Sequence, residues 1–265
     1  MAYHDTNGVT LFYTDEGDGP PVLFVHGWTC DSHDWSWQIP AFLDAGHRVI
    51  AVDLRGHGRS SVPESGYDPR TFAADIAGLL NARGTGPVVA AGHSLGGAIV
   101  SALAVEHPEL VRAIIPVDSA YGLDPAIATG LLAPLIEALK EHGAAAAGPL
   151  FDRFYTAATP PNLATWHRRR MEACPRHVMW QVFEGLFAAP DQFCIRPQTE
   201  AYFEQRTVPV LTFFADAERA AWEATTFRNA ASKSVPCEGA GHWIHQERPA
   251  EFNAIALAWI ASLSA

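Results

Sequence analysis

The stretch Gly92-His93-Ser94-Leu95-Gly96 lies between an apolar, β-branched run at residues 87–91 and a run of small residues at 97–106. The first run is typical of a buried strand, and the second is typical of a helix. A G-x-S-x-G match between a strand and a helix is typical of a nucleophile elbow, a sharp turn that lifts the serine hydroxyl above the sheet. The two glycines permit a backbone turn too cramped for side chains. We therefore interpret Ser94 as a nucleophile.

Strands and helices alternate on both sides of this turn. Continuous apolar runs predict strands buried on both faces, and Asn7-Gly8 predicts an antiparallel hairpin at the start of the chain. The alternation favours an α/β fold with a mostly parallel, doubly wound sheet. The predicted strands are 2–5, 9–15, 21–25, 48–52, 88–91, 113–117, 208–214 and 232–237, and the predicted helices are 34–44, 69–82, 97–106, 217–231 and 249–263.

Residues 119–205 interrupt the alternation. This segment is rich in alanine and aromatic residues and contains no convincing strand. We interpret it as a helical lid, or cap, inserted into a core domain formed by residues 1–118 and 206–265. Catalytic groups are then expected at the carboxyl ends of the strands, where a parallel sheet opens into a crevice.

Composition narrows the class of protein. The chain has 265 residues with 18 Lys and Arg against 29 Asp and Glu, a formal charge of −11 that disfavours nucleic-acid binding. Its four cysteines (Cys30, Cys174, Cys194 and Cys237) have no zinc-like spacing, so we expect reduced thiols. We also expect neither a metal nor a cofactor. No signal peptide or membrane-spanning run is recognisable. We expect a cytoplasmic protein without membrane contact.

Three further motifs accompany the elbow: His26-Gly27-Trp28 after the third predicted strand, residues 53–60 after the fourth, and residues 239–242 before the last helix. With these motifs the chain resembles the α/β-hydrolase fold family over essentially its whole length. The resemblance implies an α/β-hydrolase fold with an inserted helical cap. It is specific for the fold and only weakly specific for the substrate.

A serine hydroxyl needs a base to act as a nucleophile at neutral pH. The family's chain order places that histidine last, and His242 stands in a glycine-flanked loop after the final predicted strand. The nearby His245 is the alternative base. Its structural interpretation is a histidine at a helix start, packed beside this loop. We predict that His242 is the base.

An acid must orient the imidazole of that base. The family usually carries it in a Gly-x-x-Asp turn after the strand placed here at 208–214, where this chain has Ala215-Asp216-Ala217-Glu218. Some members carry it after the preceding strand, where Asp118 stands. We favour Asp118, with Glu218 and then Asp216 as alternatives. Structural interpretations also exist: Asp118 as a cap of the first lid turn, and Glu218 as a solvated acid at a helix start.

The resemblance places the oxyanion donors on the backbone N–H groups of Trp28 and Leu95. Aromatic and apolar lid residues are more often lid core than ligand contacts, but the inner lid face must roof the pocket. Among them we favour Trp180 and Phe183, which share a helix face, as substrate contacts. The basic run at residues 166–170 is interpreted as a solvated helix face rather than a gate for anionic substrates.

These residues predict a serine hydrolase that cleaves a small-molecule carboxylic ester or lactone with an apolar or aromatic group through an acyl-enzyme on Ser94. The resemblance also admits C–C bond hydrolases, perhydrolases, acyltransferases and cofactor-independent dioxygenases. The dioxygenases use a His–Asp dyad whose acid follows the same strand as Asp118. A dehalogenase is disfavoured because it needs a carboxylate in place of Ser94, and a ligand receptor is a further alternative. Whether the chain forms a homodimer is left open.

Overall fold

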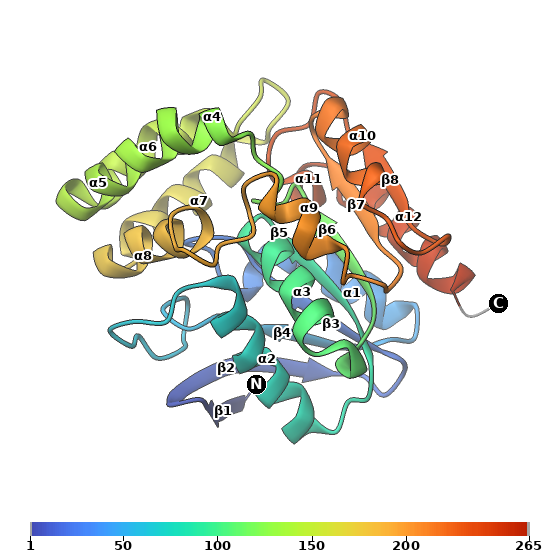
Figure 1. Cartoon of the computed structure of the whole chain (residues 1–265). Coiled ribbons are helices and arrows are strands. Elements are labelled where there is room, and N and C mark those ends of the chain that lie inside the picture. Colours follow the sequence, from blue (N-terminus) through green and yellow to red (C-terminus); the bar gives the residue numbers. More distant parts are fainter. Residues whose placement is uncertain (1, 264–265) are drawn as a thin grey trace.

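The protein is described by a computed structural model that covers residues 2–263. Within that range the chain forms an eight-stranded sheet in the order β1-β2-β4-β3-β5-β6-β7-β8 (Figure 1). The β1–β2 and β2–β4 pairs are antiparallel, and the remaining pairs are parallel. The predicted doubly wound α/β fold is confirmed. The strands are β1 (Ala2–Thr6), β2 (Val9–Glu16), β3 (Pro21–Val25), β4 (Arg48–Val52), β5 (Val88–His93), β6 (Val111–Val117), β7 (Leu211–Phe214) and β8 (Lys233–Pro236).

Side chains of the central strands alternate between two hydrophobic cores. In β3, Leu23 faces one core and the neighbouring Phe24 faces the other, as the period of two in a strand requires. Helices α2 (Pro69–Arg83) and α3 (Leu95–Glu106) cover the first face, while α1 (Gln38–Asp44) and α12 (Pro249–Ser262) cover the second. Burial on both faces explains why these strands read as continuous apolar runs.

Helical segments fill the chain between β6 and β7. They are α4 (Pro125–Ile127), the π-helical turn η3 (Ala128–Leu132), α5 (Ala133–His142), α6 (Ala144–Asp152), α7 (Pro161–Ala173), α8 (Arg176–Phe187) and α9 (Gln198–Phe203). Helices α4 to α8 form a group beyond one edge of the sheet, whereas α9 lies beside α3 (Figure 1). Tyr202 of α9 donates a hydrogen bond of 2.7 Å to Glu106 at the end of α3. We call residues 119–205 the inserted segment.

Two predicted helices were too long. Instead of one helix at 34–44, the structure has the 3-10 turn η1 (Ser32–Trp35) and then α1. Pro40 lies in the first turn of α1, and a proline is tolerated in a helix only there. The helix predicted at 217–231 ends at Thr225, the last residue of α10 (Ala217–Thr225). Beyond it, the Asn229 side chain accepts a hydrogen bond from Ala231 N–H, a turn that competes with helix.

Between β8 and α12 lies one short helix, α11 (Ile244–Glu247), which packs against η1 and α12. In the part of the chain that the structure describes, no helix has the length and apolar character needed to cross a membrane.

Candidate active site

Ser94 occupies the tight turn between β5 and α3. Its φ of 53° lies in the left-handed region, a conformation that is strained for a residue with a side chain. The turn can close only because Gly92 and Gly96, two residues to either side of Ser94, lack side chains. A Cβ at Gly92 would lie 2.1 Å from the Gly96 carbonyl oxygen, and one at Gly96 would lie 2.3 Å from the Val25 carbonyl oxygen. The sequence motif therefore corresponds to a real constraint on the backbone.

Asp118 and His242 are brought together from two different strand ends. Asp118 follows β6, and His242 lies in the loop between β8 and α11. His242 Nδ1 lies 2.5 Å from Asp118 Oδ2, and Asp118 Oδ1 accepts a hydrogen bond of 3.3 Å from the Ala215 N–H. Because an ionised carboxylate can only accept, Nδ1 carries the shared proton and Nε2 of the neutral ring is the basic nitrogen.

The Asp118 carboxylate is held in its charged form. Burial alone would raise its pKa, but the hydrogen bond and charge of His242 and the charge of Arg219 outweigh burial, so the pKa lies below its usual value. Arg219 Nη1 is 3.9 Å from Asp118 Oδ1. The Arg219 guanidinium also donates to the carbonyl oxygens of Ser119 and Tyr121 at 2.5 and 3.0 Å.

Ser94, Asp118 and His242 all line one cavity of about 230 Å³. Trp28, after β3, and Leu95, the first residue of α3, line it as well. The first-turn N–H groups of a helix lack intrahelical acceptors and favour negative charge. The rest of the lining is mostly apolar: Ala120, Leu123, Ile127, Leu131, Leu132, Leu150, Phe154, Phe183, Leu186 and Phe187, with Ser119 and Arg219 as polar members.

Of the other residues considered from the sequence, one lines this cavity and the rest lie elsewhere. Phe183 lines the cavity, but Trp180 does not belong to its lining within residues 2–263 and packs against Lys140 instead. Asp216 caps α10 by accepting hydrogen bonds from Glu218 and Arg219 N–H groups. Glu218 lines a different cavity, of about 350 Å³.

The alternative base, His245, lies outside the lining of this cavity as the described residues form it. His245 is fully buried in α11, and its ring centroid lies 4.3 Å from that of Trp35. Burial lowers its pKa to about 3.

Arg219 and the aliphatic part of the cavity were not identified from the sequence. Ile127 and Leu131 stand four residues apart and are 42% and 40% exposed, so they lie at the cavity's solvent side. Exposed apolar residues at this spacing share a helix face, and that spacing is the signal that could have revealed them. Nothing in the sequence around Arg219 distinguishes it from a surface arginine.

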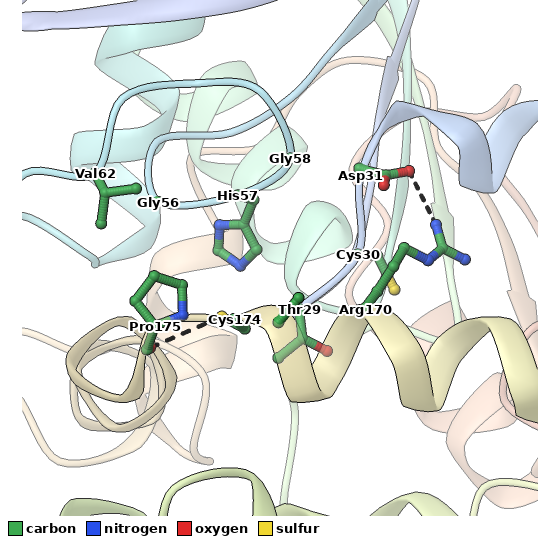
Figure 2. Close-up of a pocket in the computed structure, with 11 residues that line it drawn as sticks. Thr29, Cys30, Asp31, Gly56, His57, Gly58, Val62, Arg170, Cys174 and Pro175 are labelled. Atoms are coloured by element: carbon green, nitrogen blue, oxygen red, sulfur yellow. Dashed lines mark hydrogen bonds and ion pairs between the residues drawn. The ribbon is translucent and has the colours of Figure 1, made fainter.

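A second cavity, of about 300 Å³, lies where α7 faces the loop around His57 (Figure 2). Thr29 and Cys30 line it, directly after the Trp28 that lines the first cavity. Burial lowers the pKa of His57 to about 3, so its ring is neutral.

The basic run of α7 is only partly solvated, contrary to the expectation. Arg170 forms an ion pair with Asp31, drawn in Figure 2, and another with Asp34. His167 is fully buried and stacks on Trp243, with ring centroids 3.8 Å apart. His167 and Arg170 are three residues apart, so they lie on the same face of α7. This face packs against the core.

Residues 20–249 match the family model described as alpha/beta hydrolase fold. The non-heme chloroperoxidase CPO-A1 of Kitasatospora aureofaciens is 32% identical over 230 residues, which cover 80% of this chain and 79% of that protein. A non-heme chloroperoxidase of Streptomyces lividans is 48% identical over 98 residues, about a third (36%) of either chain. A haloperoxidase of Rhodococcus erythropolis is likewise matched over 37% of its length.

Solved structures agree with this match. A thermophilic esterase from Thermogutta terrifontis has a TM-score of 0.83 and 25% identity, covering 98% of this chain and 97% of that chain. An enol-lactonase from Burkholderia xenovorans LB400 has a TM-score of 0.85 at 21% identity, over 98% of this chain and all of that one, which shows a shared fold. The matched family model spans most of the chain, and the sheet order and strand-end site agree with it. The chain therefore belongs to the α/β-hydrolase fold family.

Proposed function

We propose that this protein is a serine hydrolase that cleaves small-molecule carboxylic esters or lactones through an acyl-enzyme on Ser94. The observation that carries the proposal is the meeting of Ser94, His242 and Asp118 on one cavity wall, with His242 Nδ1 2.5 Å from Asp118. A nucleophile, a base and an acid that orients the base form the arrangement that acyl transfer requires.

In the proposed acylation step, Ser94 Oγ attacks the substrate carbonyl carbon while His242 Nε2 takes the hydroxyl proton. Asp118 remains ionised and stabilises the imidazolium that forms. The carbonyl oxygen becomes an oxyanion, for which the backbone N–H groups of Trp28 and Leu95 are the proposed donors. Each such donor typically lowers the barrier by about 3 kcal/mol. The imidazolium then protonates the leaving alkoxide, which departs as the alcohol.

Deacylation repeats these steps with water. His242 Nε2 takes a proton from the attacking water, a second oxyanion forms, and the protonated imidazole returns its proton to Ser94 Oγ as the acid is released. In a lactone the alcohol and the acid belong to one molecule, so the product is a hydroxy acid. No cofactor is needed in this series of reaction steps.

The cavity favours an apolar acyl group. Its lining beyond the reacting residues is almost entirely aliphatic and aromatic, and the inserted segment supplies most of it. We therefore assign the inserted segment the role of a cap that roofs the substrate site, with Phe183 as a substrate contact. A volume of about 230 Å³ suits a small acyl or lactone group rather than a long chain.

Perhydrolysis is the second candidate. Two of the relatives are a non-heme chloroperoxidase and a bifunctional esterase/perhydrolase of Acinetobacter calcoaceticus, the latter 41% identical over 41% of this chain. The same acyl-enzyme would serve, with hydrogen peroxide attacking in place of water, so that the acyl group leaves as a peracid and Ser94 regains its proton.

Acyl-enzyme trapping tests both candidates. The protein is mixed with a panel of p-nitrophenyl esters and aromatic lactones, quenched in acid, and digested for mass spectrometry. We expect a mass increase equal to the acyl group on the peptide that holds Ser94, and none in the Ser94→Ala variant. Adding hydrogen peroxide during turnover should yield peracid if perhydrolysis competes. Ester turnover that persists in Ser94→Ala without a labelled peptide would reject the acyl-enzyme, and oxygen uptake with N-heteroaromatic substrates would then be measured.

A further inference from the structure

A cluster of buried polar side chains lies next to Ser94 and His242, outside the cavity that they line. It consists of Asp34 in η1, His93 at the end of β5, and His245 in α11, and one potential ligand atom of each lies within 4.8 Å of the other two. At most 1% of any of these residues is exposed. Within residues 2–263, His93 Nδ1, both nitrogens of His245 and both oxygens of Asp34 lack a hydrogen-bond partner, although Asp34 Oδ1 forms an ion pair with Arg170.

The protons of this cluster can be assigned from its contacts. His93 Nε2 lies 3.0 Å from the backbone carbonyl oxygen of His242. A carbonyl only accepts, so Nε2 carries the proton, and Nδ1 of the neutral ring is a bare acceptor. Burial lowers the pKa of both His93 and His245, so both rings are neutral. Arg170 Nη1 lies 2.6 Å from Asp34 Oδ1 and helps to hold that carboxylate ionised.

His93 Nδ1 and the Asp34 carboxylate are therefore both acceptors within one buried cluster, and His245 adds one donor and one acceptor. A water molecule fits this pattern, because it donates two hydrogen bonds and accepts from a third group. A tetrahedral water at about 2.8 Å from its partners holds them roughly 4.6 Å apart. A divalent cation would fit the lone pairs but not the charge: Arg170 already neutralises Asp34, so the ion would add buried, uncompensated charge.

We propose that the Asp34–His93–His245 cluster binds one ordered water and makes His93 a positioning residue for His242. The water donates to Asp34 and to His93 Nδ1, and this fixes the His93 tautomer that donates to the His242 carbonyl. The role rests on the proposed function, in which His242 is the base.

The backbone of His242 is held from two sides. Its carbonyl accepts from His93, and its N–H donates to the Phe154 carbonyl of the inserted segment at 2.9 Å. The Phe154 ring also stacks on the His242 ring, with centroids 4.3 Å apart. Within residues 2–263, the imidazole itself is held through a ring nitrogen by the hydrogen bond between Nδ1 and Asp118. Loss of the His93 bond would let the backbone, and with it Nε2, move relative to Ser94.

The cluster also connects His242 to α7. Arg170 extends from α7 and contacts both Asp31, as Figure 2 shows, and Asp34. The ion pair with Asp34 holds that carboxylate at one side of the proposed water. The inserted segment thus supports the base through Arg170 and through Phe154, in addition to roofing the cavity.

Two variants separate positioning from packing. His93→Gln keeps an N–H that can reach the His242 carbonyl, whereas His93→Met fills similar space without a donor. With a p-nitrophenyl ester we expect His93→Met to lower kcat by about 10- to 100-fold, the size of effect that a small misplacement of a catalytic group produces. KM should change less than threefold. His93→Gln should recover most of the loss in kcat.

A second readout does not depend on turnover. We expect the proton between His242 Nδ1 and Asp118 to give a far-downfield NMR resonance, which should shift or broaden in His93→Met and stay near the wild-type position in His93→Gln. If no ester is turned over by any form, the proposed function fails while this resonance still tests the positioning. Wild-type kcat and resonance in a folded His93→Met protein would overturn the inference. If His93→Met does not fold, Asp34→Asn replaces it, with the same shift expected.

A high-resolution crystal structure tests the occupant. We expect one density peak at about 2.7–3.2 Å from His93 Nδ1, an Asp34 oxygen and a His245 nitrogen, which are hydrogen-bond distances. Metal analysis of the purified protein should find no stoichiometric metal, and titration with ZnCl₂ should produce no saturable binding that Asp34→Asn removes. A peak at about 2.0–2.2 Å from the three atoms would identify a metal site instead, and an empty cluster would also overturn the proposal.

Discussion

The two walls of the substrate cavity are built in different ways. On the core wall, Ser94 and Asp118 are single residues at strand ends with positive φ values of 53° and 41°, held by backbone contacts that admit little variation. On the opposite wall, the inserted segment supplies apolar side chains from several helical segments, and two of them, Ile127 and Leu131, are about 40% exposed. Under the proposed function, we infer that the core wall sets the type of reaction and that the inserted segment sets the choice of substrate.

Removing the nucleophile should have the largest effect. In Ser94→Ala the core wall keeps its shape, because the backbone turn depends on the flanking glycines, but the acyl-enzyme can no longer form. We expect kcat for the best ester to fall by about 10⁴- to 10⁶-fold, with a melting temperature close to that of the wild type. Steady-state kinetics and thermal unfolding measure the two quantities. A loss below tenfold would place the chemistry elsewhere.

The acid of the core wall is tested by a matched pair of variants. Asp118→Asn keeps the shape of the side chain but removes the charge that orients and stabilises the His242 imidazolium, so kcat should fall by about 10⁴-fold. Glu218→Gln changes an acid in a separate cavity and should leave kcat within twofold of the wild type. Equal losses in the two variants, or a larger loss in Glu218→Gln, would contradict the choice of Asp118.

The contrast between the walls also explains what the sequence could reveal. Strand–turn–helix order and the glycines around Ser94 encode the core wall locally, so the fold and the strand ends could be predicted within a few residues. The loop of Asp118 was predicted from its place after a strand, whereas Arg219, which contacts Asp118 at 3.9 Å, lies 101 residues further along the chain. No local pattern links such a pair.

The inserted segment was harder to interpret for a physical reason. Its helices have apolar residues for packing on each other as well as for the cavity, and periodicity cannot separate these uses. Trp180 and Phe183 share a helix face, yet only Phe183 of the two lines the cavity. Arg170 and His167 looked like part of a solvated face because their buried partners lie far away in the sequence.

Replacing Phe183 and Trp180 in turn with leucine tests which of the two contacts the substrate. Phe183→Leu removes aromatic surface from the cavity wall, so KM for an aromatic ester should rise by about 5- to 20-fold, a loss of roughly 1–2 kcal/mol, with a smaller change in kcat. Trp180→Leu should leave KM within twofold, since its ring packs against Lys140. Initial rates over a range of ester concentrations give KM and kcat for both variants. The interpretation of the wall fails if Trp180→Leu has the larger effect.

The smallest predicted effect concerns how α7 is joined to the core. Burial lowers the pKa of His167 from its ordinary value of 6.5 to about 4. As the pH falls below 6.5, the unfolded chain therefore binds a proton at this histidine that the folded protein does not, and the free energy of unfolding decreases until about pH 4. Each such histidine contributes a slope of about 1.4 kcal/mol per pH unit in this window.

His167→Phe keeps a ring that can stack on Trp243 but cannot be protonated. Its free energy of unfolding should be lower at pH 7, because the contact of His167 Nε2 with Gln246 is lost. Between pH 6 and pH 4.5, however, it should depend less steeply on pH than that of the wild type. Urea unfolding at several pH values gives both slopes. Parallel slopes would mean that His167 is protonated in the folded protein as readily as in the unfolded chain, and that α7 is joined to the core less tightly than its contacts indicate.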